Sequence, residues 1–286
     1  MPEMPEVQAH AERMTAALGG AELTGFRLLN FASLKTFDPP PDASKGTRLV
    51  DVGRRGKYLL MRFDNGHTHV VHLMQGGRLR PDPKETKKPR GGLMRWTFAA
   101  GDRDELGTPS WLLTEAGTER RAGLWVLRDD PLAQEPLDHL GPEATDLSVD
   151  ALATTVRRHS KRLHGLLRDQ RVVAGLGRML TNEVLYEAEL SPFVNASKLS
   201  DDDVARLHSS IASVVASALA HERTLDDIGK SVDRPSKVHN RAGEPCVDCG
   251  DTIRTIDYRA YTVYYCPTRQ TGGRLLADNS TSKFLK

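Results

Sequence analysis

The sequence opens with Met1-Pro2-Glu3-Met4-Pro5-Glu6, and this stretch decides how the rest of the chain is interpreted. Proline at position 2 is small enough for methionine aminopeptidase to remove Met1, which would leave Pro2 as a free secondary amine. An unperturbed α-amino group has a pKa of about 7.7–8.0, so an appreciable fraction is neutral and nucleophilic near pH 7. Its attack on a sugar or aldehyde carbon would give an iminium ion that acts as an electron sink. Taken alone, Pro and Glu in a first helical turn are also ordinary capping chemistry.

The composition sets wide limits on the class of protein. With 286 residues, the chain is long enough for two domains with their own cores, or for two domains and a small appendage. The net charge is only +2 and the pI about 8.4, so a nucleic-acid-binding surface would have to come from clustered basic residues. There is no apolar run of 18 residues and no basic-then-apolar leader. We therefore expect a cytoplasmic protein without a membrane span.

The spacing of apolar residues predicts an α+β fold. A helical stripe runs from Pro5 to Leu18 and ends at Gly19-Gly20. Short β runs separated by turn residues then predict a β-sandwich or flattened barrel, and they cover residues 48–52, 58–63, 69–73, 93–98, 111–114 and 124–127. Two polar stretches, 81–92 and 101–109, are expected to be mobile loops.

The second half of the chain changes to a helical pattern. Residues 129–146 contain four prolines or glycines among acidic residues and predict an interdomain connection. Helices are then predicted over 148–167, 176–189 and 200–223, the last with Ser200 as its N-cap. Residues 225–237 are expected to be a loop. The predicted domains are residues 1–130, 147–225 and 238–286.

Five segments in the same order resemble the formamidopyrimidine-DNA glycosylase and endonuclease VIII family, whose proteins begin Pro-Glu-Leu-Pro-Glu-Val. They are the opening, Gly53–Leu60, Thr118–Gly123, Val172–Glu183 and a C-terminal Cys-x-x-Cys hairpin. Together they span nearly the whole chain. The resemblance implies an N-terminal helix with a β-sandwich domain, a helical domain with a helix–two-turn–helix, and a C-terminal zinc-ribbon-like β-hairpin.

The resemblance also implies catalytic roles for three residues. Pro2 would attack C1′ of a damaged nucleotide, Glu3 would protonate the sugar ring oxygen or shuttle protons, and Lys57 would hold a phosphate and assist. Elimination would then cleave the strand. The implied function is a bifunctional DNA-repair glycosylase with abasic-site lyase activity. Without the resemblance, Lys57 would be taken for a solvated cation at a strand end.

A loop side chain of the family enters the duplex where the damaged nucleotide has been extruded, because an unfilled gap there costs a few kcal/mol. Counted from His72, Gln75 falls where the formamidopyrimidine branch has Met, and Met74 falls where endonuclease VIII has Gln; both stay candidates. Arg120 matches the arginine that faces the orphaned partner base. Ala122 replaces a bulky wedge, which predicts looser discrimination of the opposite base.

The helix–two-turn–helix supplies two further implied DNA contacts. Gly175 and Gly177 would let the backbone turn tightly and present amides to a phosphate at the start of the next helix. The family usually has Asn after the second glycine, whereas this chain has Arg178, which can bind phosphate as a bidentate cation. Glu183 matches a glutamate that orders the lesion pocket.

The C-terminal hairpin departs from the family at the residue that enters the minor groove. Relatives carry an arginine where this chain has Tyr261, and the nearest arginine is Arg259. If residues 258–265 form one strand, both side chains lie on one face, about 7 Å apart. The groove contact has then moved to Arg259 or been lost.

Three of four positions of a zinc ribbon carry cysteine, and they are Cys246, Cys249 and Cys266. Clustered cysteines in a chain without a leader indicate metal binding rather than disulfides. The fourth position is Arg269, which cannot ligate zinc, so a water, His239 or a carboxylate such as Asp248 would have to complete the site. We expect a weakly held zinc or none, with the hairpin held by packing of Tyr258, Tyr264 and Tyr265.

The expected partner is damaged double-stranded DNA, at the nucleoid, and the expected state is a monomer. Two alternatives stay open. One is a non-catalytic or weakly active protein that binds DNA damage on the same scaffold; the complete set of Pro2, Glu3 and Lys57 argues against it. The other is an interaction module that no longer binds DNA, which a salt-independent DNA affinity would favour.

Overall fold

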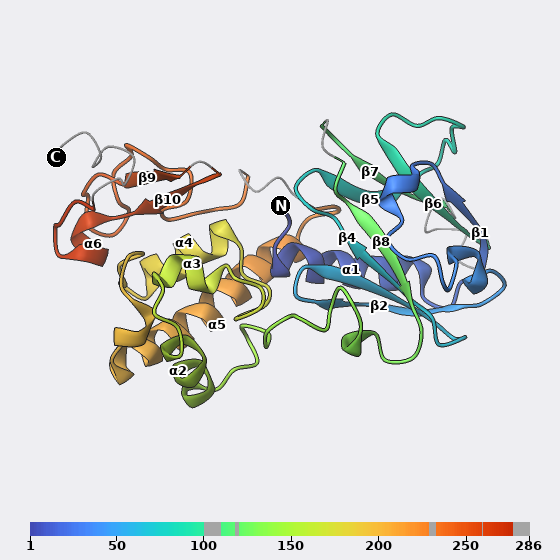
Figure 1. Ribbon diagram of the computed structural model, residues 1–286. Coiled ribbons are helices and arrows are strands. Elements are labelled where there is room, and N and C mark those ends of the chain that lie inside the picture. Colours follow the sequence, from blue (N-terminus) through green and yellow to red (C-terminus); the bar gives the residue numbers. More distant parts are fainter. Residues whose placement is uncertain (100–109, 118–119, 229–232, 259, 277–286) are drawn as a thin grey trace. The chain divides into compact units, whose positions relative to one another are not determined.

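The computed structural model describes the chain except for residues 100–109, 118–119, 229–232, 259 and 277–286. The described residues form two compact units (Figure 1). The first contains residues 1–139 and 222–229, and the second contains residues 140–221 and 230–286. The helical segment and the C-terminal hairpin share the second unit, so the division of the chain into three domains stays a prediction.

The first unit is a helix and a β-sandwich, as expected. Helix α1 (Met4–Leu18) precedes two antiparallel four-stranded sheets. One sheet has the order β2 (Leu49–Arg55), β3 (Tyr58–Phe63), β4 (Thr68–His72) and β8 (Gly123–Leu127). The other has the order β1 (Leu23–Leu28), β6 (Gly92–Phe98), β7 (Ser110–Glu115) and β5 (Gly77–Pro81). One apolar core joins both sheets to α1 and includes Met14, Met61, Val71, Trp96 and Leu113.

Strands β1 and β5 were not predicted from the sequence. Both lie at the edges of their sheet, where a strand buries few side chains and the apolar signal is correspondingly weak. In β1 only Leu23 is fully buried, and β5 has two arginines and ends at Pro81. The polar stretch before β6 contains no helix or strand over residues 82–91, as expected, whereas the second polar stretch lies outside the described residues.

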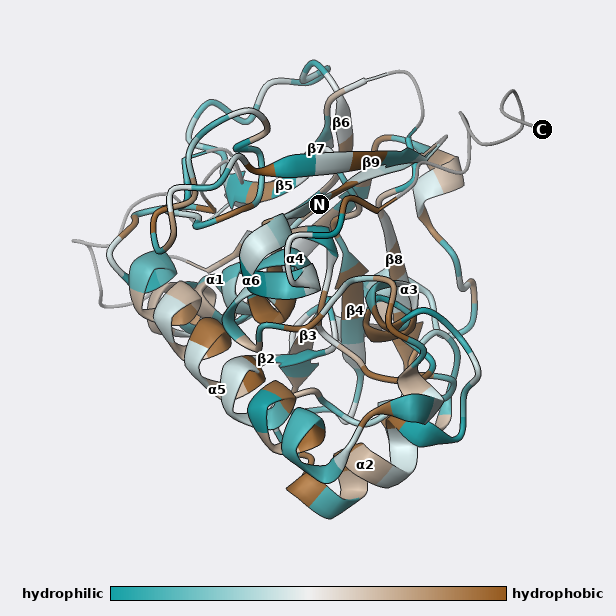
Figure 2. Cartoon of the chain, turned by 90° about the vertical axis from the view of Figure 1, so that its left-hand side faces the viewer, coloured by the Kyte–Doolittle hydropathy of each residue, from teal (hydrophilic) through white to brown (hydrophobic). Residues whose placement is uncertain are grey.

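The second unit is helical and ends in a hairpin. Its elements are α2 (Val149–Arg157), α3 (Leu163–Leu167), α4 (Arg178–Glu187), α5 (Asp201–Arg223), β9 (Arg254–Tyr258), β10 (Tyr261–Tyr265) and α6 (Pro267–Thr271). Along α5, apolar and polar residues alternate with the helical period (Figure 2), and the buried side includes Val204, Leu207, Ile211 and Val215. The predicted cap is confirmed, because Ser200 Oγ accepts the Asp203 amide hydrogen at 3.1 Å.

Two predicted elements are divided in the structure. The single helix expected over 148–167 is two helices, because the segment between them pairs with a distant one: Arg162 bridges Asn195, and the Leu163 amide donates to the Val194 carbonyl. The run 258–265 is not one strand, because β9 ends at Tyr258 and this residue pairs with Tyr261, where β10 begins. The alternation argument that linked Arg259 to Tyr261 along one strand was therefore wrong, and Arg259 lies outside the described residues. Within the described chain, no helix has both the length and the apolar character needed to cross a membrane.

Candidate functional site

The N-terminal residues are held by the start of α1. The Glu3 amide donates to Glu6 Oε2 at 3.0 Å, which satisfies one of the free amide groups at the helix start. Pro2 is buried, and the exposed fractions of Glu3 and Glu6 are only 5% and 2%. Negative charge at a helix N-terminus interacts favourably with the helix dipole. Glu3 is therefore the N-cap residue of α1, directly after Pro2.

A cavity of about 310 Å³ lies next to this N-terminus. Met1 lines it together with Met74, Gln75 and Arg121. The two candidate gap-filling residues differ in environment, because Gln75 is exposed while Met74 is half-buried and packs against the core. Met74 also has a left-handed backbone, with φ of 51°. The turn around it is tight: a Cβ on Gly77 would lie 2.2 Å from the Leu73 carbonyl oxygen.

Lys57 lies in the turn between β2 and β3 and is only 8% exposed. Burial, reinforced by the Lys57 charge, lowers the pKa of His72 to about 4. The neutral ring is then free to accept, and the Met74 amide donates to His72 Nδ1 at 3.0 Å. His72 thus shapes the turn that carries both candidate residues. Sequence reasoning missed this role, because a histidine at a strand end carries no signal for it.

In the segment before β8, the predicted contact residues Arg120 and Ala122 lie in different environments. Arg120 is exposed and is not among the residues that line the cavity, whereas its neighbour Arg121 is. Ala122, the position of the family's wedge, is fully buried, and its amide donates to Glu115 Oε2 at 2.8 Å. The wedge position therefore faces the core of the first unit.

In the second unit, the tight turn before α4 is built as the glycines predict. Gly175 has a φ of 99°, which a side chain would strain, and its amide donates to Gln170 Oε1 at 3.0 Å. Gly177 caps α4, and Arg178 is its first residue. The Arg178 guanidinium donates to the Ala260 carbonyl of the hairpin at 3.4 Å.

Tyr261 is half-buried and belongs to an aromatic stack. Its ring lies 4.7 Å from that of Tyr258 and 5.9 Å from that of His164, and both pairs are nearly parallel. The Arg168 guanidinium covers it at 3.9 Å from the ring centroid. Arg162 donates to the Tyr258 hydroxyl at 3.0 Å. The position that relatives give to a groove-entering arginine is thus part of a packed cluster.

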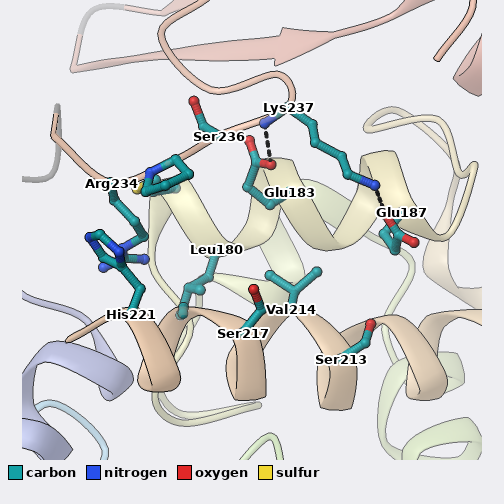
Figure 3. Close-up of a pocket in the computed structure, with 13 residues that line it drawn as sticks. Leu180, Glu183, Glu187, Ser213, Val214, Ser217, His221, Arg234, Ser236 and Lys237 are labelled. Atoms are coloured by element: carbon teal, nitrogen blue, oxygen red, sulfur yellow. Dashed lines mark hydrogen bonds and ion pairs between the residues drawn. The ribbon is translucent and has the colours of Figure 1, made fainter. Parts of the chain in front are cut away.

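Glu183 anchors the segment of residues 237–239 to α4. Its carboxylate accepts the amide hydrogens of Lys237, Val238 and His239 at 2.8, 3.1 and 2.8 Å. Burial raises the pKa of Glu183, and the three amides oppose that rise. The Lys237 ammonium also pairs with Glu187 at 2.9 Å. Figure 3 shows the contacts of Lys237 with Glu183 and Glu187 beside a cavity of about 380 Å³ between α4, α5 and residues 234–237.

Asn182, which sequence reasoning missed, connects three segments. Its amide group donates to His239 Nδ1 at 2.7 Å, and its carbonyl accepts from His164 Nε2 at 3.1 Å. Asn182 is 1% exposed. A polar residue at a buried helical position was the available signal, because such a residue needs fixed hydrogen-bond partners.

The cysteine cluster forms as the spacing predicts. The sulfur atoms of Cys246, Cys249 and Cys266 all lie within 4.8 Å of one another, close enough to hold a metal ion. Among the described residues, neither of the two side chains proposed as a fourth ligand belongs to this group: Asp248 pairs with Arg269 at 3.0 Å, and His239 binds Asn182. A structural zinc site is a closed tetrahedron of four ligands. The residues present therefore do not fit one.

The three tyrosines expected to hold the hairpin do pack within it. Tyr265 is 1% exposed and Tyr258 lies against its cluster with Ile256 and Val263. Tyr264 packs against a second cluster that contains two of the cysteines. The hairpin thus has an apolar interior of its own, small in extent.

Two family models match the chain. The formamidopyrimidine-DNA glycosylase N-terminal domain covers residues 1–108, and the formamidopyrimidine-DNA glycosylase H2TH domain covers residues 132–228. The formamidopyrimidine-DNA glycosylase of Chloroflexus aurantiacus is 30% identical over 285 residues, which cover 94% of this chain and 98% of that protein. An uncharacterised formamidopyrimidine-DNA glycosylase-like protein of Mycobacterium tuberculosis is 39% identical over 149 residues, which cover 51% of this chain and 94% of that protein.

Solved structures share the fold. The Fpg protein (MutM) of Thermus thermophilus superposes with a TM-score of 0.80 at 24% identity and covers 94% of this chain and 98% of its own. A Lactococcus lactis Fpg mutant in complex with DNA that contains Fapy-dG has a TM-score of 0.83 at 22% identity, with coverages of 94% and 100%. The chain therefore belongs to the formamidopyrimidine-DNA glycosylase and endonuclease VIII family.

Proposed function

We propose that this chain is a DNA-repair glycosylase that removes damaged bases from double-stranded DNA and cleaves the strand at the resulting abasic site. The names of its curated relatives support the reaction class, and the solved complexes of Fpg with damaged and abasic DNA support the partner. One observation in this chain carries the proposal. Met1 lines a cavity with the 74–76 turn, directly beside the buried residues Pro2 and Glu3.

In the proposed mechanism, loss of Met1 turns the Pro2 nitrogen into the chain terminus at the edge of this cavity. Its lone pair attacks C1′ while the glycosidic electrons leave with the damaged base, and the nitrogen loses its proton. The C1′–O4′ bond then breaks, and the nitrogen lone pair forms the C=N bond of a ring-opened iminium ion. Glu3 supplies a proton to the sugar ring oxygen. Loss of a C2′ proton then expels the 3′ phosphate by β-elimination, and water releases Pro2 from the sugar.

Of the two candidates for the gap, we favour Gln75. Its side chain is exposed at the cavity, whereas Met74 packs against the core and would leave it only at the cost of apolar burial. Arg120 and Arg178 are proposed DNA contacts, and both are basic residues on loop or helix-start positions with exposed or half-exposed side chains. For Glu183 we propose a supporting role, because its carboxylate is occupied by the 237–239 backbone.

Borohydride trapping on a duplex with a single abasic site tests the nucleophile directly. Borohydride reduces the iminium to a stable amine, so protein that has lost Met1 should become covalently attached to the DNA. The matched control is the same protein with an uncleaved tag before Pro2, which should bind the duplex and give no adduct.

A Pro2→Gly variant is a weaker control, since it keeps a primary amine and can retain some trapping. Equal trapping by the tagged protein would exclude Pro2 as the nucleophile. Salt-sensitive binding of the abasic duplex without any adduct from untagged protein would instead identify a non-catalytic damage binder.

A further inference from the structure

Arg269 stands three residues after Cys266, at the position where a four-cysteine ribbon has its last ligand. Its guanidinium pairs with Asp248 at 3.0 Å and with Glu189 at 2.9 Å. It also lies over the ring of Tyr186, 4.8 Å from the centroid. The Arg269 side chain is only 21% exposed. The Arg269 guanidinium therefore contacts Asp248 in the first cysteine turn, Glu189 just after α4 and the buried ring of Tyr186.

A ribbon zinc normally ties its two cysteine turns to each other. Here the turns of residues 246–251 and 266–271 are joined directly by protein groups. Arg269 of the second turn pairs with Asp248 of the first. Asp251 of the first turn accepts two hydrogen bonds from Thr268 of the second, at 3.1 Å from the amide and 2.8 Å from the hydroxyl.

The same turns are fastened to the helical part of the unit. The hydroxyl oxygen of Tyr186 in α4 lies 2.9 Å from the sulfur of Cys246. Gln270 accepts the Cys266 amide hydrogen at 2.9 Å and donates to the Leu190 carbonyl at 3.0 Å. These bonds connect the segments without using a fourth thiolate.

The charge of Arg269 works against a metal at the same place. A guanidinium has five N–H donors and no acceptor, so it cannot coordinate a cation and repels one nearby. The carboxylate closest to the thiols in sequence, Asp248, is committed to that guanidinium. We propose that Arg269 takes over the role of the ribbon zinc, so that the C-terminal hairpin is cross-linked by the Asp248–Arg269–Glu189 bridge and is folded without metal.

The proposed role of Arg269 predicts different responses to zinc and EDTA for two variants. Arg269→Cys restores a four-thiolate set and should gain stoichiometric zinc, with a melting temperature that rises with zinc and falls with EDTA. The wild-type melting temperature should not respond to either reagent.

Asp248→Asn breaks the bridge without adding a ligand and should lower the melting temperature by about 2–4 °C, whether or not EDTA is present. As a matched control, Asp38→Asn, which breaks the exposed Arg128–Asp38 pair, should cause no measurable shift.

Thiol reactivity keeps the test decisive if Arg269→Cys fails to fold. Cys249 is exposed in the wild-type structure, so a disulfide reagent such as DTNB should modify it at the same rate with and without chelator. Zinc-bound thiolates are protected until the metal is removed. Protection that only a chelator relieves, or tightly held zinc in wild-type protein, would overturn the proposal. The readouts are melting temperature, metal content and thiol reactivity, so their outcome is independent of the glycosylase activity.

Discussion

At the scale of single residues, the N-terminal site holds two ionisable side chains out of water. Glu3 and Lys57 are 5% and 8% exposed, although an ionised group is costly to bury without charged or hydrogen-bonding partners. Glu3 is the N-cap residue of α1, while Lys57 belongs to the turn between two strands. Since the two residues come from different elements, their contributions to catalysis should be separable.

Glu3→Gln should slow base removal by about 10²–10⁴-fold, the usual contribution of a general acid. It should affect cleavage of a preformed abasic site less, because no glycosidic bond is left to break. Lys57→Ala should weaken the processing of both substrates by reducing DNA engagement. Single-turnover assays on a lesion duplex and on an abasic duplex measure the two steps.

Lys35→Ala provides the matched control, since Lys35 is an exposed lysine of the same unit. It should leave both steps unchanged. Equal losses for the Glu3 and Lys57 variants on both substrates would show that these residues do not have distinct roles.

At the scale of elements, α4 organises the second unit because each of its faces has a different partner. Its first residue, Arg178, reaches the hairpin connection. Asn182 and Glu183 bind residues 237–239, and Tyr186 contacts Cys246. Ten residues of helix thus hold together segments that lie far apart in the sequence.

The Glu183 contacts predict a local loss of order. Glu183→Ala removes the acceptor of three amide hydrogens, and each one left buried without a partner costs about 1–3 kcal/mol unless water reaches it. We expect faster hydrogen exchange at residues 237–239, with exchange inside α4 nearly unchanged. Mass-resolved hydrogen exchange measures both segments in one experiment.

Glu187→Ala is the control, because it removes only the exposed pair with the Lys237 ammonium. A pair of this kind contributes about 0.2–1 kcal/mol. If both variants exchanged alike at residues 237–239, the carboxylate of Glu183 would not be the anchor.

At the scale of the whole molecule, both units bury neutral histidines. Burial is the main cause that lowers the pKa of four of them, to about 4 for His10 and His72 and to about 3 for His69 and His164. His69 is held in one tautomer: Trp96 donates to its Nδ1 at 3.0 Å, so its proton is on Nε2, 3.1 Å from Ser44 Oγ. If Nδ1 of His69 were protonated, its N–H group would point at the N–H group of the Trp96 ring.

These histidines predict acid sensitivity. In the unfolded chain each has a pKa of about 6.5, so below that pH the unfolded state binds more protons than the folded state. Stability is therefore present above pH 6.5 and is lost as the pH falls toward the folded-state values of about 4 and about 3. The loss is about 1.4 kcal/mol per pH unit for each such histidine. Urea unfolding at pH 7, 6 and 5 measures it.

A histidine variant identifies the source of the slope. His69→Gln should lower stability at pH 7 and reduce the slope by one proton. A free energy of unfolding that does not change between pH 7 and 5 would contradict the prediction.

Features that depend on neighbouring residues in the chain were determined by the sequence itself. The helix at the N-terminus, the central strands, the capped amphipathic helix α5 and the tight turn at Gly175 all follow from apolar period, caps and glycine. The spacing of the cysteines likewise predicted their cluster. Resemblance in five segments identified the family, and the roles of Pro2, Glu3 and Lys57 follow from that resemblance rather than from local pattern.

Only the tertiary structure decided which distant groups meet. Edge strands β1 and β5, the break between α2 and α3, and the pairing of Tyr258 with Tyr261 within the expected run 258–265 depend on contacts with other segments. The Arg269 bridge and the stacking of Tyr261 are of the same kind. Hydrophobic period reports which face of an element is buried, but not what covers it. A polar side chain finds its partner only after the chain has closed, and so its role cannot be read from its own neighbourhood.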